Sequence, residues 1–182
     1  FRDSILHNER MQIGEFIRPQ ACVLTDENRE PISLSLIAAS PELRYVEREI
    51  IYGLTRSGYA LSAIEGRVRD LILREIDVLR RRFDAIIFDC PPGISAFTEG
   101  VLKASDLIIA PVILDTLSTL GLVAFCNRVL APPRANFGEL SKPWVVANRV
   151  QPTAMHKRTL MEMRRVASEA DSAFCVFSNE VP

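Results

Sequence analysis

The segment Phe83-Asp84-Ala85-Ile86-Ile87-Phe88-Asp89-Cys90-Pro91-Pro92-Gly93 decides the fold class. Its apolar residues, 85–88, predict a strand buried on both faces, which Asp89 ends. Two further apolar runs follow at 107–110 and 144–147. A candidate helix comes after each of the three runs, at about 95–104, 116–131 and 154–170. Apolar strands that alternate with helices indicate an α/β fold, with a mostly parallel β-sheet and helices on both faces.

The first half of the chain predicts short elements. Asp3 or Ser4 begins a candidate helix over 3–17, and Pro19 ends it. Strands are expected at 22–25 and 34–38. A helix should follow Ser40-Pro41-Glu42, then a looser stretch at 53–58, then a longer helix at about 64–82.

The composition fits one globular domain. The 182 residues are 48% apolar and 25% charged, and the longest apolar run, 107–114, has only eight residues. A membrane helix needs about 20, so no transmembrane segment is expected. A net charge of −1 argues against a uniformly basic nucleic-acid binder. Four separated cysteines and two histidines form no zinc pattern, and the first residues show no secretory signal, so a cytosolic protein is expected.

Asp89 and Gly93 stand where an open parallel sheet binds ligands, beyond the carboxyl end of a strand. A strand-end carboxylate needs a cation or hydrogen-bond donors, and Mg²⁺ carrying nucleotide phosphates is a common partner. Gly93 leaves room for a phosphate to approach the backbone. The alternative is that Asp89 only caps the following helix and holds a turn.

The second half of the chain resembles the ParA/MinD family of deviant-Walker ATPases, which have a P-loop NTPase-like fold. The D-C-P-P motif at 89–92, the A-x-D-x-x-I-x-P-V block at 104–112 and Gly121-Leu122 follow in family order and spacing. The likeness is close over 80–182 and extends to 1–79 only in general layout, and ParA-type partition proteins fit best. It implies ATP and Mg²⁺ as cofactors, a homodimer formed on ATP binding, non-specific DNA binding on the nucleoid, and a ParB-like stimulating partner.

The resemblance also assigns roles to single residues. Asp89 matches the Walker B aspartate, which holds Mg²⁺ through a water, and Gly93 lies in the segment that senses the γ-phosphate. Asn148 matches a residue that reads the adenine edge, with Arg149 beside it, and Pro182 matches a position against the base. From the residues alone, a polar strand end that begins a loop is the simpler interpretation of Asn148 and Arg149.

One departure from the family pattern is large. The family's phosphate loop, K-G-G-x-G-K-[S/T], is missing, since the eight glycines are scattered and none precedes a lysine. We therefore expect residues 1–182 to be a single incomplete nucleotide-binding domain without its first β-α-β unit and its final strand and helix. Such a chain should not hydrolyse ATP by itself.

A basic stretch stands out between residues 142 and 165. It carries six cations against Glu162 alone, a local charge of +5. The resemblance implies DNA binding here, and helical spacing gathers the four candidates Lys157, Arg158, Arg164 and Arg165. On charge alone, an ordinary solvated helix face is the better interpretation.

Other interpretations stay open. One is a MinD-like, or cellulose- or flagellum-associated, ATPase that positions machinery at a membrane. Another is a degenerate binding module that does not hydrolyse nucleotide. His7 and His156 are interpreted as surface or capping residues, Cys90 as a packing residue, and Asp115 receives no catalytic role.

Overall fold

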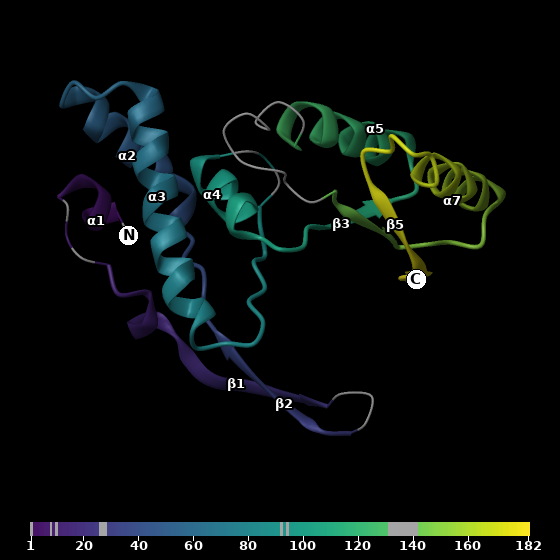
Figure 1. Ribbon diagram of the computed structural model, residues 1–182, viewed down its shortest axis with the longest axis horizontal. Coiled ribbons are helices and arrows are strands. Elements are labelled where there is room, and N and C mark those ends of the chain that lie inside the picture. Colours follow the sequence, from purple (N-terminus) through teal and green to yellow (C-terminus); the bar gives the residue numbers. More distant parts are fainter. Residues whose placement is uncertain are drawn as a thin grey trace. The chain divides into compact units, whose positions relative to one another are not determined.

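The computed structural model describes residues 2–7, 9, 11–25, 29–91, 93, 95–130 and 142–182. The chain divides into two compact units, which we call unit 1 (Phe1–Val101) and unit 2 (Leu102–Pro182). Unit 1 holds a β-hairpin and long helices, and unit 2 holds a parallel sheet with its helices (Figure 1). The assignment of one domain to residues 1–182 stays a prediction.

Helices form the core of unit 1. α1 (Arg2–Leu6) packs against α2 (Leu43–Arg56), and α3 (Leu61–Arg80) contacts both. The buried side chains of α3 recur at helical spacing: Ile64, Val68, Leu71, Ile72, Ile76 and Leu79. The helices predicted after Ser40 and at 64–82 are thereby confirmed.

The helix predicted over 3–17 is wrong beyond Leu6. α1 ends there, and only a short 3₁₀ helix, η1 (Ile13–Phe16), follows. Residues 7–12 contain one apolar side chain, Met11. A continued helix would therefore have no apolar stripe to bury against α2 or α3.

The stretch predicted to be loose, 53–58, is mostly helical. α2 runs through Gly53 to Arg56, and a Cβ atom on Gly53 would lie 2.9 Å from Leu6 Cδ2, so this glycine admits the side chain of α1. α2 ends at Arg56, and Gly58, two residues further on, has a φ of +85°. There the Gly58 and Tyr59 N–H groups donate to the carbonyl oxygens of Thr55 and Leu54, 3.0 and 3.1 Å away, which is a Schellman ending.

The two predicted strands of the first half form an antiparallel hairpin. β1 (Arg18–Thr25) pairs with β2 (Pro31–Leu36), and Leu24 lies opposite Ile32. β2 begins three residues earlier than the apolar pattern indicates.

Residues 85–88 do not form the predicted strand. They lie in an irregular stretch between α3 and the next helix, α4 (Ala96–Ala104), and the Ile87 side chain is 89% exposed. A strand requires a neighbour whose backbone completes its hydrogen bonds. None of the described residues supplies that pairing to 85–88. Residues 85–88, the apolar run from which the fold class was predicted, thus pair with no strand among the described residues.

Unit 2 confirms the α/β class. Three parallel strands, β3 (Ile109–Ile113), β4 (Trp144–Asn148) and β5 (Cys175–Glu180), lie side by side in that order. α5 (Thr116–Phe125) and the π-helical turn η2 (Cys126–Leu130) follow β3, and α7 (Ala154–Ala167) connects β4 to β5. β3 begins two residues later than predicted. β5 was not predicted, because its second half, Ser178-Asn179-Glu180, is polar.

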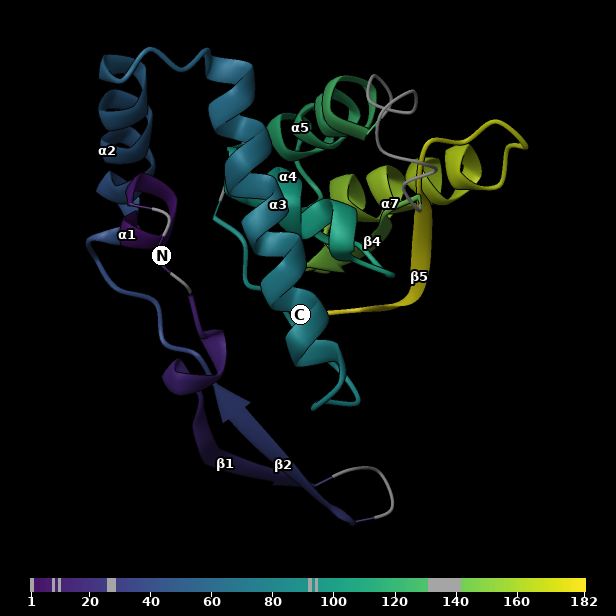
Figure 2. The same ribbon diagram turned by 60° about the vertical axis from the view of Figure 1, so that its left-hand side comes forward.

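The core of unit 2 lies between one face of the sheet and two helices. β3 contributes Val112 to this core, and Leu114 follows directly after that strand. β4 contributes Val145 and Ala147. Leu122 and Cys126 from α5 and η2, Leu160 and Met163 from α7, and Phe174 before β5 complete it. α5 and α7 therefore share one face of this sheet (Figure 2). On the opposite face the rings of Trp144 and Phe177 lie 5.0 Å apart.

Candidate functional site

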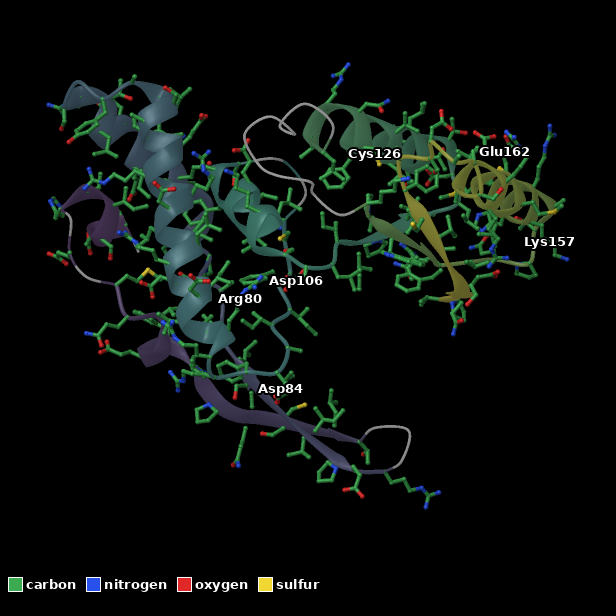
Figure 3. The ribbon with its side chains drawn as sticks, viewed as in Figure 1. Arg80, Asp84, Asp106, Cys126, Lys157 and Glu162 are labelled. Carbon is green, nitrogen blue, oxygen red and sulfur yellow. The ribbon has the colours of Figure 1, made fainter. Side chains whose placement is uncertain are left out.

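The carboxylate of Asp89 is exposed in the irregular stretch that follows α3. Figure 3 labels Asp84, five residues earlier in the same stretch. Partial burial, and then the negative charge of Asp89, raise the pKa of the neighbouring Cys90 thiol. A thiol with a raised pKa is protonated at neutral pH and is a poor nucleophile. Cys90 is exposed, however, so the packing role expected for it is not seen among the described residues.

Gly93 adopts a backbone conformation that only glycine accepts readily. Its φ is +117°, and a Cβ atom built on it would meet nothing within 4 Å. Conformation rather than crowding therefore requires the glycine. The open space beside it would let a phosphate group approach the backbone.

The structure assigns the cap of α4 to Ser95. The Ser95 Oγ accepts a hydrogen bond from the Thr98 N–H at 3.3 Å, and the Ala96 N–H donates to Glu47 Oε1 at 3.1 Å. The first turn of α4 is thus satisfied without Asp89. Among the residues that the structure describes, none forms a hydrogen bond or ion pair with the Asp89 carboxylate, which could therefore serve a ligand.

Asp89 fits one part of a magnesium site. Mg²⁺ keeps several waters and takes one or two protein carboxylates together with phosphate oxygens. Among the described residues there is no group of three or more His, Cys, Asp or Glu side chains that could enclose a metal. Asp89 could therefore supply only one carboxylate of such a site, and the other oxygen ligands would have to come from water or from a bound ligand.

Asn148, Arg149 and Pro182 come together at the carboxyl ends of β4 and β5. The Val150 N–H donates to the Val181 carbonyl oxygen, and the Val181 N–H donates to the Ala147 carbonyl oxygen, both at 2.9 Å. These bonds place Pro182 next to the turn that Asn148 and Arg149 form. Asp89 and Gly93 belong to unit 1, whereas this turn belongs to unit 2.

The Asn148–Arg149 turn has a left-handed residue. Arg149 has a φ of +54°, and its N–H donates to Asn148 Oδ1 at 3.0 Å. Arg149 is exposed and Asn148 is half-buried. The polar strand end that begins a loop is therefore present, and it is compatible with either interpretation of these two residues.

His156 is buried, so its interpretation as a surface residue is wrong. Only 7% of it is exposed, and its Nδ1 accepts a hydrogen bond from the Gln151 N–H at 3.0 Å. Its own N–H donates to Thr153 Oγ1, which caps α7, at 3.2 Å. Threonine is a favoured helix cap, so Thr153 could have indicated from the sequence that His156, three residues later, lies in the first turn of a helix.

The chain is similar to known proteins over much of its length. A family model described as an AAA domain matches residues 8–133, which are well over half of the chain. This range contains Asp89 and Gly93. The chain belongs to the ParA/MinD family. The sporulation initiation inhibitor protein Soj of Bacillus subtilis is 29% identical over 97 residues, which are 53% of this chain and 34% of Soj. The matched segment thus spans about a third of the length of that relative, and no solved structure matches the chain.

In this family member the candidate DNA-binding cations are not equivalent. Lys157 and Arg158 on α7 are exposed. Arg164 Nη2 donates to the Ser178 carbonyl oxygen at 2.8 Å and to Glu180 Oε1 at 3.1 Å. Arg165 is paired with Glu162 and Glu169, at 2.7 and 2.8 Å. Lys157 and Glu162 project from the same helix (Figure 3).

The ion pairs reduce the positive charge of this surface without removing it. The hydrogen bond and charge of Glu162, with the charge of Glu169, raise the pKa of Arg165, which stays protonated. All of these side chains are exposed, so solvent screens each pair and the pairs are weak. A phosphate group could therefore exchange with a carboxylate partner.

Asp115 has a structural role as the cap of α5. Its Oδ1 accepts from the Ser118 N–H at 2.7 Å, and this hydrogen bond is the main cause of the lowered pKa of Asp115. A carboxyl group with a lowered pKa in the folded state stabilises that state above its unfolded pKa, about 3.9. The contribution is lost as the pH falls through the folded-state pKa.

Replacing Asp115 with Ala is therefore expected to lower the thermal unfolding midpoint at pH 7 and to have progressively less effect below about pH 4. Thermal unfolding of both proteins between pH 7 and pH 3 measures this difference. Asp115→Asn is the matched control, since an amide caps a helix without titrating. A difference between wild type and Asp115→Ala that is constant over this range would contradict the assignment.

Proposed function

We propose that the intact protein is a ParA-type ATPase that dimerises on binding ATP, binds DNA non-specifically and moves or positions a plasmid, chromosome or other cargo. The observation that carries the proposal is the family match over 8–133, which includes the D-C-P-P segment. It is supported by the turn at the ends of β4 and β5, where three further candidate residues meet. The 182 residues contain no Gly-Lys pair, so the proposal concerns the full-length protein.

Each candidate residue would have its own part in nucleotide binding within its own unit. Magnesium, when bound with ATP, would neutralise charge on the phosphates. Asp89 would orient a water of the metal shell, and the open backbone at Gly93 would admit the γ-phosphate. Asn148 offers both a donor and an acceptor to the edge of adenine. Arg149 would lie beside that amide, and Pro182 would lie against the base.

The DNA surface of this proposal is the exposed side of α7. Lys157 and Arg158 would make the first phosphate contacts, because both are exposed and neither forms an ion pair with a carboxylate at contact distance among the described residues, although the charge of Arg158 acts on Glu162. Arg164 and Arg165 would join by exchanging their carboxylate partners for phosphates. Contacts to phosphates do not depend on the base sequence, and a cytoplasmic protein that associates with the nucleoid needs such non-specific binding. A ParB-like partner would stimulate hydrolysis and release the dimer from DNA.

Membrane positioning is the competing function within the same family. None of the helices that the structure describes combines the length and the hydropathy needed to cross a bilayer. No described feature favours a membrane surface over DNA, so the two are distinguished by experiment.

The proposal predicts that Mg-ATP converts the full-length protein from monomer to dimer. Light scattering coupled to gel filtration should give twice the monomer mass with Mg-ATP and the monomer mass with ADP or with ATP and a chelator. A protein that stays monomeric and binds no nucleotide would contradict the proposal and would match a degenerate binding module. ATP-dependent binding to anionic vesicles but not to DNA would identify the membrane-positioning function.

A further inference from the structure

We propose that His156 is a positioning residue for the Asn148–Arg149 turn and acts through its unprotonated Nδ1. The inference rests on the proposed function, in which this turn reads the base of the nucleotide. It adds a residue that contacts no ligand and that determines whether the turn can discriminate adenine.

The first step is the protonation state of the ring. Nδ1 accepts the Gln151 N–H at 3.0 Å, so the proton of the neutral imidazole must be on Nε2. His156 is one of three buried polar residues among those described, with Thr98 and Ser172. Its ring is therefore fixed in position by burial and by this hydrogen bond together.

The second step is the rigidity of the helix that carries His156. It stands in the first turn of α7, where its N–H is bound by Thr153 Oγ1. Leu160 and Met163, later on the same helix, belong to the core against the sheet. The imidazole ring thus belongs to a helix that packs against the sheet, whereas Gln151 lies in an exposed loop. The hydrogen bond ties an exposed loop to that element.

The third step is the need of the turn for support. Arg149 has a φ of +54°, a left-handed conformation that is unfavourable for an L-residue and persists only where surrounding contacts impose it. On the strand side the Val150 and Val181 N–H groups supply those contacts, at 2.9 Å each. On the helix side the Thr153 N–H binds the Gln151 carbonyl oxygen at 2.8 Å, and His156 binds the Gln151 N–H. His156 is the side chain that holds the helix side of the turn.

Three substitutions in the full-length protein separate positioning from packing. His156→Asn keeps an acceptor on the atom bonded to Cγ, as Nδ1 is. His156→Gln moves the acceptor one bond further out, and His156→Phe keeps a ring without an acceptor. Ser172→Ala is the control, because it removes another buried hydrogen bond of unit 2, from the Ser172 hydroxyl to the Phe174 carbonyl oxygen, and leaves His156 and its helix turn unchanged.

The readouts are the affinities for fluorescent ATP and GTP analogues with Mg²⁺, and hydrogen exchange of the Gln151 amide. Loss of one hydrogen bond corresponds to a change of roughly 3–10-fold. In the Gln and Phe variants we expect faster hydrogen exchange of the Gln151 amide. We also expect their preference for ATP over GTP to fall by the same roughly 3–10-fold. His156→Asn should stay within about twofold of wild type, and Ser172→Ala should keep the preference for ATP whatever its stability.

The possible failures are distinguishable. Loss in the Asn and Gln variants with wild-type behaviour of the Phe variant would show that His156 only fills space, and equal loss in all three would show that an acceptor at the position of Nδ1 does not matter. Either result would overturn the positioning role. Faster exchange at Gln151 with an unchanged ATP preference would also overturn it, while the proposed nucleotide site stands. A wild-type protein that binds ATP and GTP equally would overturn the proposed reading of adenine, and the positioning role with it.

Discussion

Replacing Asp89 with Asn in the full-length protein is expected to lower the rate of Mg-ATP hydrolysis by about 10–100-fold, the usual effect of removing a residue that orients a metal ligand. Asparagine has the shape of aspartate and keeps an acceptor, but it lacks the charge that holds a water of the magnesium shell. Phosphate release at saturating ATP, measured over a range of Mg²⁺ concentrations, checks this result. The variant should require more Mg²⁺ than the wild type for half-maximal rate.

Asp84→Asn is the matched control for this experiment. Asp84 lies five residues before Asp89 in the same irregular stretch and is also exposed (Figure 3). The substitution makes the same change of charge, so any general effect of removing a carboxylate should appear in both variants. Equal impairment of the two, or wild-type hydrolysis by Asp89→Asn, would remove Asp89 from the magnesium site.

Reversing the charge of Lys157 and Arg158 together is expected to weaken binding to a non-specific DNA duplex by roughly tenfold or more at about 0.1 M salt. Each lost phosphate contact releases about one counterion fewer. The slope of log affinity against log salt should therefore fall by about two. Fluorescence anisotropy of a labelled duplex with the ATP-bound protein, measured over a series of salt concentrations, gives both quantities.

Two further variants test the arrangement of charges on α7. Glu162→Gln removes one carboxylate partner of Arg165 and should strengthen DNA binding, because Arg165 is then more available to a phosphate. Arg56→Glu, a reversal at an exposed arginine of α2 in unit 1, should have little effect. Undiminished and salt-insensitive binding by the Lys157 and Arg158 variant would contradict a DNA surface on α7.

Local sequence signals predicted the helices better than the strands. α3 followed from its apolar spacing, and the cap at Thr153 agrees with the start of α7. Strands depend on partners that are distant in sequence, and this explains both failures in the sheet. Residues 85–88 have the apolar composition of a buried strand but no described partner, whereas β5 is a strand despite the polar residues in its second half, because β4 pairs with it.

The candidate site was predictable only where a motif marked it. Asp89, Gly93 and Asn148 stand at recognisable positions in the sequence. His156 carries no such mark, since its importance comes from burial and from a backbone N–H five residues earlier. The charge of the basic stretch was overstated because the count ended at residue 165. Two of the carboxylates that bind its arginines, Glu169 and Glu180, lie beyond that point.

The central claim is that Asp89 belongs to a magnesium-dependent ATP site in the intact protein. The most direct measurement is a calorimetric titration of the full-length protein with ATP in the presence and absence of Mg²⁺, for the wild type and for Asp89→Ala. We predict binding by the wild type that is tighter with Mg²⁺, and loss of that magnesium dependence in the variant. A wild-type protein that does not bind Mg-ATP, or a variant that binds it as tightly as the wild type, would contradict the claim.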